Sequence, residues 1–109
     1  MESSFLDVGR ITYYDAAVIR TFRSKDAELI FRGLPSKQFH RLAAVIERKL
    51  VQMHAATALS DISIFPGNRL EALKGSRLWQ HSIRINDQYR ICFVWKDGDA
   101  YAVEIVDYH

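Results

Sequence analysis

The C-terminal segment, residues 69–109, concentrates the side-chain types that RNA cleavage without a metal ion requires. In that reaction the ribose 2′-hydroxyl attacks its own phosphate. The reaction needs a proton acceptor, a proton donor, and cations that stabilise the charge growing on the phosphoryl oxygens. Unpaired bases also need an aromatic or guanidinium plane on which to stack. The segment supplies each type, at Arg90, Lys74, Tyr108, His109 and Glu71.

The histidines and glycines argue against two other kinds of enzyme. The histidines have no spacing typical of metal ligands and no paired carboxylates near them; they are His40, His54, His81 and His109. The five glycines are scattered at turns, so no glycine-rich loop is present to hold a phosphate. We therefore expect no metal site, no cofactor and no nucleotide hydrolase.

Alternation of apolar and polar residues predicts strands around these side chains. It runs through residues 80–85, is interrupted at Asn86-Asp87, and resumes through residues 89–95. Asp97-Gly98 then supplies the pair favoured by a tight hairpin turn, and a β-rich run follows. We expect an antiparallel meander of three strands from these segments. Its ends and edges carry the cations and aromatics Lys74, Arg77, Arg84, Arg90, Tyr108 and His109.

Two helices are expected ahead of the sheet. Ser24 is placed to cap the first, with Asp26 and Glu28 in its first turn, where carboxylates interact favourably with the helix dipole. Gly33 ends it. Ser36 is placed to cap the second helix, because an apolar stripe then follows at steps of three and four. The stripe consists of Phe39, Leu42, Ile46, Leu50 and Met53.

The remaining segments complete the expected domain. Residues 18–22 predict a short strand, and Phe65 is expected to pack back on the core ahead of a turn at Pro66-Gly67. Lys37, Arg41 and Arg48 share a face of the second helix, which is either a solvated surface or a contact surface. Helices followed by antiparallel strands predict an α+β domain with the helices on one face of the sheet.

Composition is typical of a single globular domain in the cytoplasm. The chain has 109 residues, of which 49% are hydrophobic and 26% charged, so it holds one core and is not disordered. No apolar run approaches the roughly 20 residues of a membrane helix, and the N-terminus does not have the pattern of a secretory signal. Cys92 lies within a strand pattern and is expected to be a small core residue. The net charge of +2 is too small to indicate nucleic-acid binding by itself.

Three stretches of the chain carry a resemblance to a known family. They read G-N-R-L-E-A-L-K-G from residue 67, H-S-I-R-I-N-D-Q-Y-R-I-C-F from residue 81 and V-E-I-V-D-Y-H from residue 103. In order and spacing they resemble the HigB-type toxins of the RelE superfamily, which bacteria encode beside an antitoxin. The similarity runs from about Val18 to His109. It implies a RelE-like fold, in which two N-terminal helices pack on an antiparallel sheet and the first strand joins the last in parallel.

The resemblance implies roles for individual residues. Arg90 matches a strand arginine that stabilises the phosphate, and Lys74 matches a lysine used similarly. Tyr108 and His109 match a terminal pair that positions the base and moves protons, and Asp107 matches the acidic neighbour of that pair.

Three further residues are expected to contact the substrate. Gln88 stands where some relatives have an asparagine that helps to hold the RNA. Arg84 and Arg77 are candidates for phosphate contacts on charge alone.

The implied activity is that of a toxin of a type II toxin–antitoxin pair that cleaves mRNA on the translating ribosome. Attack by the 2′-hydroxyl would leave a 2′,3′-cyclic phosphate. The implied partners are the ribosome with its mRNA and a helix-turn-helix antitoxin that also represses the operon, so that operator DNA is reached only through the antitoxin. The small net charge of +2 suits an enzyme that takes its grip on the substrate from the ribosome.

One departure from the family keeps two other functions open. Some members have a histidine where this sequence has Glu71, and a carboxylate would repel the phosphate unless it were paired or protonated. Glu71 is therefore either a base or a structural residue bonded to Arg69 or Arg90, and a weak toxin is expected. The alternatives are a non-catalytic domain that binds RNA or protein, and a co-repressor that acts mainly through its antitoxin.

Several residues also have purely structural interpretations. Arg90 would pair with Glu104 across the sheet, and His81 would be a core or edge histidine. Trp79 and Trp95 are expected in the core rather than as base-stacking platforms. Residues 1–17 fit the family poorly, and we expect either an extension upstream of a true start at Val18 or a partly ordered N-terminal arm.

Overall fold

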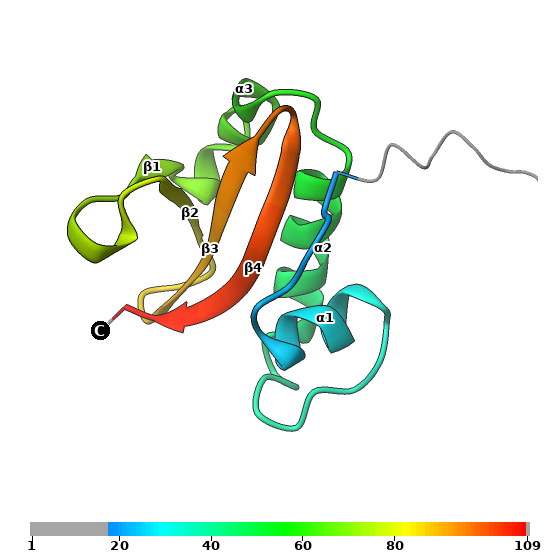
Figure 1. The fold of residues 1–109 in the computed structure, drawn as a ribbon. Coiled ribbons are helices and arrows are strands. Elements are labelled where there is room, and N and C mark those ends of the chain that lie inside the picture. Colours follow the sequence, from blue (N-terminus) through cyan, green and yellow to red (C-terminus); the bar gives the residue numbers. More distant parts are fainter. Residues whose placement is uncertain (1–17, 109) are drawn as a thin grey trace, which may run out of the picture.

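The computed structural model describes residues 18–108, in which helices cover one face of a four-stranded antiparallel sheet (Figure 1). The elements in chain order, with η for a 3-10 turn, are α1 (Lys25–Phe31), α2 (Ala43–His54), α3 (Leu59–Ser63), η2 (Pro66–Asn68), β1 (Glu71–Ala72), η3 (Gly75–Arg77), β2 (Gln80–Arg84), β3 (Tyr89–Lys96) and β4 (Asp99–Asp107). The expected α+β domain is thus confirmed. The expected arm at residues 1–17 and the terminal His109 lie outside the described residues.

The sheet is the expected meander with one more strand. Its order is β1-β2-β3-β4, and every neighbouring pair is antiparallel. Asp97 and Gly98 both have positive φ angles, of 53° and 83°, and join β3 to β4 where Lys96 pairs with Asp99. This is the hairpin that the sequence predicts, because a tight turn that matches the twist of its strands needs left-handed residues at its centre.

The segment at residues 18–22 lies beside β4, as the family resemblance implied. Ile19 and Phe22 form isolated parallel bridges with Ala100 and Val103. Arg20 N–H donates to the Ala100 carbonyl at 2.8 Å, and Arg23 N–H donates to the Val103 carbonyl at 2.9 Å. The N-terminal segment therefore covers the outer edge of β4, which would otherwise present unpaired backbone groups.

The core lies between α2 and the facing side of the sheet. Ile46, Leu50 and Met53 of α2 are fully buried, as are Ile83 of β2 and Phe93 of β3. Their spacing of three or four along α2 and of two along the strands is what the sequence predicts for an amphipathic helix on a sheet. No helix among residues 18–108 has the length and apolarity needed to cross a membrane.

The second helix begins later than expected, at Ala43 instead of beside Ser36. Residues 37–42 form turns, in which Ser36 Oγ accepts a hydrogen bond from Phe39 N–H at 3.3 Å and donates one to Asp26 Oδ1 at 2.8 Å. Phe39 is still buried. The apolar stripe therefore predicted correctly that Phe39 is in the core, but it was wrong in placing Phe39 within the helix. Because Lys37 and Arg41 precede the helix, the expected shared face with Arg48 was wrong.

Two aromatic residues expected in the core are on the surface. Trp79 is 81% exposed and Phe65 is 39% exposed, whereas Trp95 is half-buried and packs against the core as expected. Trp79 has a φ of 79°, in the left-handed region. Hydrophobicity alone predicted burial in both cases, and it does not report a left-handed backbone such as that of Trp79.

The attachment of the N-terminal segment to α2 should depend on pH. His54 Nδ1 accepts a hydrogen bond from Ile19 N–H at 3.3 Å, and burial lowers the pKa of His54. The unfolded chain therefore binds the proton more readily near pH 6.5, the ordinary pKa of histidine. We predict that the free energy of unfolding is fully maintained above about pH 7 and falls as the pH drops through about 6.5 and below.

Thermal melts between about pH 5 and pH 8 test this prediction. The dependence of Tm on pH should be shallower in His54→Gln, while a residual slope comes from His81, whose pKa burial also lowers. His40→Gln, at an exposed histidine, is the matched control and should keep the original slope. Equal slopes in His54→Gln and the unchanged chain would contradict the assignment.

Candidate active site

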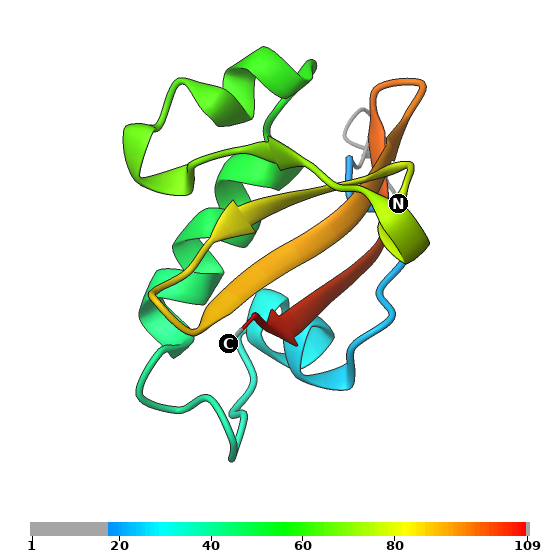
Figure 2. The same ribbon diagram turned by 90° about the vertical axis from the view of Figure 1, so that its left-hand side faces the viewer.

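The face of the sheet opposite α2 carries a row of polar side chains, and Figure 2 looks onto the strands with α2 behind them. Ser82 of β2 pairs with Cys92 of β3, which in turn pairs with Glu104 of β4. Arg90 lies two residues before Cys92 and is on the same face, since side chains alternate along a strand. Glu71 of β1 is paired with Ser82 at the edge of this face.

Arg90 is buried, with only 9% of its surface exposed, and its guanidinium is fixed by several acceptors. Its Nε donates to Ser82 Oγ at 2.7 Å, and its Nη2 donates to the Arg69 carbonyl at 2.6 Å and to the Ser82 carbonyl at 3.3 Å. A buried cation needs such partners because desolvation without them is costly. The charge is therefore held at one place on the sheet.

The loop that supplies the Arg69 carbonyl is itself anchored on α2. Lys49 Nζ donates to Asn68 Oδ1 at 2.7 Å, and Asn68 Nδ2 donates to the Ile62 carbonyl at 3.0 Å. Burial lowers the pKa of Lys49, and the neighbouring cations Arg48, Arg84 and Arg90 lower it further. Arg69 has a left-handed backbone with φ of 44°. This buried link fixes the loop at the place where its carbonyl meets Arg90.

Glu71 and Tyr108 are the two expected catalytic residues that lie beside Arg90. The Glu71 carboxylate is 3.9 Å from Arg90 Nη2, and the ring centre of Tyr108 is 5.9 Å from the Arg90 guanidinium carbon. Both side chains are exposed, Tyr108 at 44%. Tyr108 N–H donates to the Gln88 carbonyl at 2.7 Å, which ties the end of the chain back to the β2–β3 turn. The site thus has a buried cation below an accessible aromatic ring.

The residues expected to bind substrate are Gln88, Asp107, Arg84 and Arg77. The first three lie at or near the β2–β3 turn and the end of β4, and Arg77 lies apart from them. Gln88 Nε2 donates to Asp107 Oδ2 at 3.1 Å, next to Tyr108. Arg84 pairs with Asp87 at the β2–β3 turn. Arg77 lies further along the sheet.

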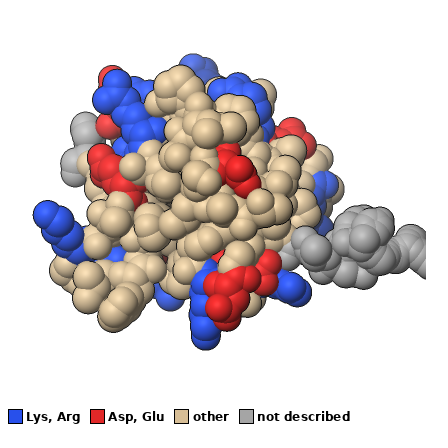
Figure 3. All heavy atoms as spheres, turned by 90° about the horizontal axis from the view of Figure 1, so that it is seen from above, with Lys and Arg blue, Asp and Glu red and all other residues tan. Residues whose placement is uncertain are grey.

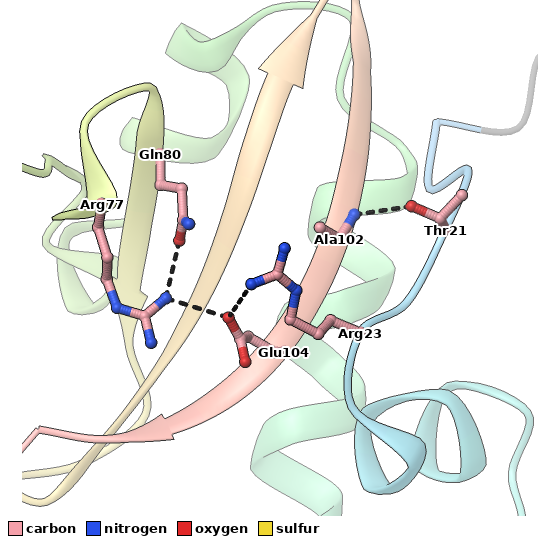
Figure 4. Close-up of polar contacts among 6 residues, drawn as sticks. All are labelled: Thr21, Arg23, Arg77, Gln80, Ala102 and Glu104. Atoms are coloured by element: carbon pink, nitrogen blue, oxygen red, sulfur yellow. Dashed lines mark hydrogen bonds and ion pairs between the residues drawn. The ribbon is translucent and has the colours of Figure 1, made fainter.

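Arg77 is held over β4 by a carboxylate. Its Nη1 donates to Glu104 Oε2 and to Gln80 Oε1, both at 3.0 Å, and Glu104 is also 3.9 Å from Arg23 (Figure 4). The interaction with Glu104 raises the pKa of Arg77. The expected pairing of Glu104 with Arg90 was therefore wrong, because Glu104 is shared by two other arginines.

Lys74 and His109 complete the set of expected catalytic residues. Lys74 is exposed and directly precedes η3, where its carbonyl accepts a hydrogen bond from Arg77 N–H at 3.1 Å. His109 lies outside the described residues, although it follows Tyr108 directly in the sequence. The structure therefore groups Arg90, Glu71 and Tyr108 and places Lys74 on the adjoining loop.

Two other titratable residues have structural positions. His81 stacks on Phe93 with ring centres 6.1 Å apart, and its buried Nδ1 has no hydrogen-bond partner within the described part of the chain. Burial lowers the pKa of His81 and raises the pKa of the Cys92 thiol. Cys92 is fully buried, as expected for a small core residue. His81 lies on the helix-facing side of the sheet, whereas Cys92 lies on the same side as Arg90, between Ser82 and Glu104.

Among residues 18–108 there is no group of three or more His, Cys, Asp or Glu side chains able to hold a metal ion. Seen from above (Figure 3), side chains of both signs lie among uncharged ones on the surface of the molecule.

A separate apolar groove lies on the helix side of the sheet, between α2 and the α3 region. It has a volume of about 650 Å³ and is lined in part by Val51, Ile64 and Phe65. Phe65 is exposed because it forms one wall of this groove. Its lining includes Arg48 and Phe65, but it contains none of Arg90, Glu71 and Tyr108, so we do not regard it as the active site.

Sequence reasoning missed the groups that hold Arg90. Ser82 was expected only as a polar residue in an alternating strand. The Arg69 acceptor is a backbone carbonyl, which every residue has, so the sequence could not identify it. Arg23, which shares Glu104 with Arg77, was not expected at the site either. The positive φ of Arg69 and the burial of Asn68 are structural signals that no local pattern contains.

Comparison with known proteins identifies relatives along nearly the whole chain. Residues 13–109 match the family described as the RelE-like toxin of type II toxin–antitoxin system HigB. The chain is 30% identical over 99 residues to the Endoribonuclease HigB of Proteus vulgaris, with 84% of this chain and all of that protein covered. It is 53% identical over 53 residues to the Toxin HigB-1 of Vibrio cholerae serotype O1, a match that covers 49% of this chain and 56% of that protein.

Among solved structures, the YoeB dimer from Staphylococcus aureus is similar at a TM-score of 0.49 and 18% sequence identity. That match covers 85% of this chain and 99% of the other chain.

The hydrogen bonds of Arg90 predict a selective loss of stability. Arg90→Lys retains the charge but cannot reproduce both the Ser82 and the Arg69 bonds, which leaves buried acceptors unsatisfied. We expect the free energy of unfolding to fall by about 1–3 kcal/mol. Urea unfolding measures this loss, and Arg84→Lys, at a partly exposed ion pair, is the matched control with an expected change within about 0.5 kcal/mol. Equal losses in the two variants would contradict the buried network.

Proposed function

The chain belongs to the HigB-like family of RelE-like toxins of type II toxin–antitoxin systems, and we propose that it is an endoribonuclease that cleaves mRNA on the translating ribosome. The observation that carries this proposal is the placement of the Arg90 guanidinium beside Tyr108 and Glu71. The name of the Proteus vulgaris relative supports the same reaction class.

The proposed reaction needs only RNA and protein side chains. The 2′-oxygen loses its proton and forms a bond to phosphorus, while the bond from phosphorus to the 5′-oxygen breaks. The products are a 2′,3′-cyclic phosphate and a 5′-hydroxyl, so one proton must be removed and one delivered. His109 carries these protons in our proposal, and no redox partner or metal is required.

Arg90 stabilises the charge that develops on the phosphoryl oxygens. Because its Nε and Nη2 are already bonded to Ser82 and Arg69, the cation needs no reorganisation when the transition state forms. Lys74 adds a second, exposed cation. Tyr108, 44% exposed above Arg90, offers its ring to the base next to the cleaved bond. Asp107 and Gln88 hold the end of β4 in place through their 3.1 Å hydrogen bond.

The implied partners follow from the family and the proposal. A type II toxin has an antitoxin, and we propose a helix-turn-helix protein that also represses the operon and links this chain to operator DNA. The ribosome supplies the grip on mRNA that a net charge of +2 does not provide. A cytoplasmic location follows from that partner.

A non-catalytic binding domain is the second candidate, and one observation favours it. The Glu71 carboxylate lies 3.9 Å from Arg90 and offsets the charge that a phosphate would use. In that case the chain would bind RNA or antitoxin without cutting. The cleavage assay below separates the two candidates, because antitoxin binding is expected in both.

The two central residues of the proposal can be tested by mapping cuts. Arg90→Ala and a chain that ends at Tyr108 should each lower mRNA cleavage by about 100-fold or more, because a charge stabiliser or the proton carrier is lost. Primer extension in a reconstituted translation reaction, with and without ribosomes, measures the cuts. Arg32→Ala removes an exposed arginine of the α1 end and should leave cleavage unchanged. Full cleavage by both altered chains, shown to be folded by circular dichroism, would refute the assigned roles.

Glu71 gives a second, opposite prediction. If it is a structural partner of Arg90, Glu71→Gln removes a negative charge near the phosphate and should leave cleavage unchanged or raise it a few-fold. The same assay at several pH values measures the effect. A loss of about tenfold or more would instead assign Glu71 as the general base.

A further inference from the structure

Trp79 combines two features that rarely occur together in a folded chain. Its indole ring is 81% exposed, and its backbone has a φ of 79°, in the region that glycine adopts most readily. A tryptophan side chain that stays exposed contributes little hydrophobic free energy to folding. A left-handed backbone is strained for a bulky side chain. Both features work against stability at this position, so they point to a role outside the fold.

The segment that carries Trp79 is fixed to the same face of the sheet as Arg90. Arg77, two residues before it, donates to Gln80 Oε1, one residue after it, so a polar bridge closes over Leu78 and Trp79. Arg77 also reaches Glu104 on β4 at 3.0 Å (Figure 4). The bridge and the ion pair hold the backbone, while the two apolar side chains at the tip are left in solvent.

The Arg77–Glu104 ion pair lies close to Arg90 along the sheet. Glu104 is paired with Cys92, which lies two residues along β3 from Arg90. Two strand residues correspond to about 7 Å. The ion pair of Arg77 therefore lies next to the row of Arg90, on the side away from Tyr108, which follows the far end of β4.

We propose that Trp79 is a stacking platform for an unpaired base of the RNA, beyond the nucleotides held at Arg90 and Tyr108. This inference rests on the proposed ribonuclease function and names a further contact with its substrate. Lys74 is exposed on the same segment and provides a cation for the RNA backbone near that base, and Arg77, which pairs with Glu104, adds a second positive charge to the segment. Alternation of cations with an exposed ring is the arrangement that binds single-stranded nucleic acid.

An RNA base suits this position better than a protein surface does. A tryptophan that anchors a protein contact sits among apolar neighbours that exclude water. Here the apolar neighbour in sequence is Leu78, which is itself 52% exposed and so does not shield the Trp79 ring from water. Lys74, on the same segment, is also exposed. Stacking on one face of a ring needs no surrounding pocket, since every base has a planar face.

Three substitutions separate the ring from the backbone. Trp79→Gly removes the ring and relieves the left-handed strain, so Tm should be unchanged or higher while cleavage falls about tenfold. Trp79→Ala removes the ring and keeps the strain, so cleavage should fall equally without the gain in Tm. Trp79→Phe keeps an aromatic face and should retain most of the cleavage. Phe65→Ala, at an exposed aromatic of the helix-side groove, is the matched control and should not affect cleavage.

A binding measurement complements the cleavage assay. In a Trp95→Phe chain Trp79 is the remaining tryptophan. A single-stranded RNA with 2′-O-methyl groups cannot be cut, and its binding should quench the fluorescence of Trp79 through stacking. An RNA duplex of the same sequence, whose bases are not free to stack, should quench much less.

The outcomes distinguish this inference from the function on which it rests. Unchanged cleavage in Trp79→Gly, alongside loss of cleavage in Arg90→Ala, overturns the inference and leaves the ribonuclease standing. The same result with a weakened antitoxin complex assigns Trp79 to a protein contact and also overturns it. If the unchanged chain cuts nothing, the ribonuclease proposal fails, and quenching by the methylated RNA then decides whether Trp79 binds RNA at all.

Discussion

The burial of one guanidinium on the open face of the sheet is the constraint on which the site depends. Arg90 is 9% exposed, and a cation so placed is tolerated only with acceptors in fixed positions. Ser82 supplies one acceptor from the adjacent strand, and the Arg69 carbonyl supplies another from the loop before β1. That loop is held in turn by the link from Lys49 to Asn68, so α2 on one side of the sheet determines where the charge lies on the other.

The same strands thus form the core with one face of the sheet and the polar network around Arg90 with the other. Ile83, Ile91 and Phe93 bury the helix-facing side and supply stability, while Ser82, Arg90 and Glu104 alternate with this apolar set and order the polar side. Glu104 is shared by Arg77 and Arg23, so it joins the loop before β2 to the N-terminal segment across β4.

Much of the fold could be predicted from local sequence, because period, capping and turn chemistry act over a few residues. The β2–β3–β4 meander, the Asp97-Gly98 turn and the Ser24 cap are of this kind. The start of α2 could not, since an apolar stripe reports burial and continues through turns at Phe39. The Arg69 carbonyl that holds Arg90 is 21 positions away in the sequence, and Arg77, which holds Glu104, is 27 positions away. At such separations the types of the side chains do not indicate which residues pair. Trp79 was misplaced for a related reason, because hydrophobicity says nothing of a left-handed backbone.

The central claim is that Arg90 supports attack by the 2′-hydroxyl on mRNA held by the ribosome. The most direct test is end-group analysis of mRNA that this chain cuts in a reconstituted translation reaction. Our account predicts a 2′,3′-cyclic phosphate on the upstream fragment and a 5′-hydroxyl on the downstream fragment, only when ribosomes are present. A 3′-hydroxyl with a 5′-phosphate would contradict it, because those products require water or another external nucleophile in place of the ribose.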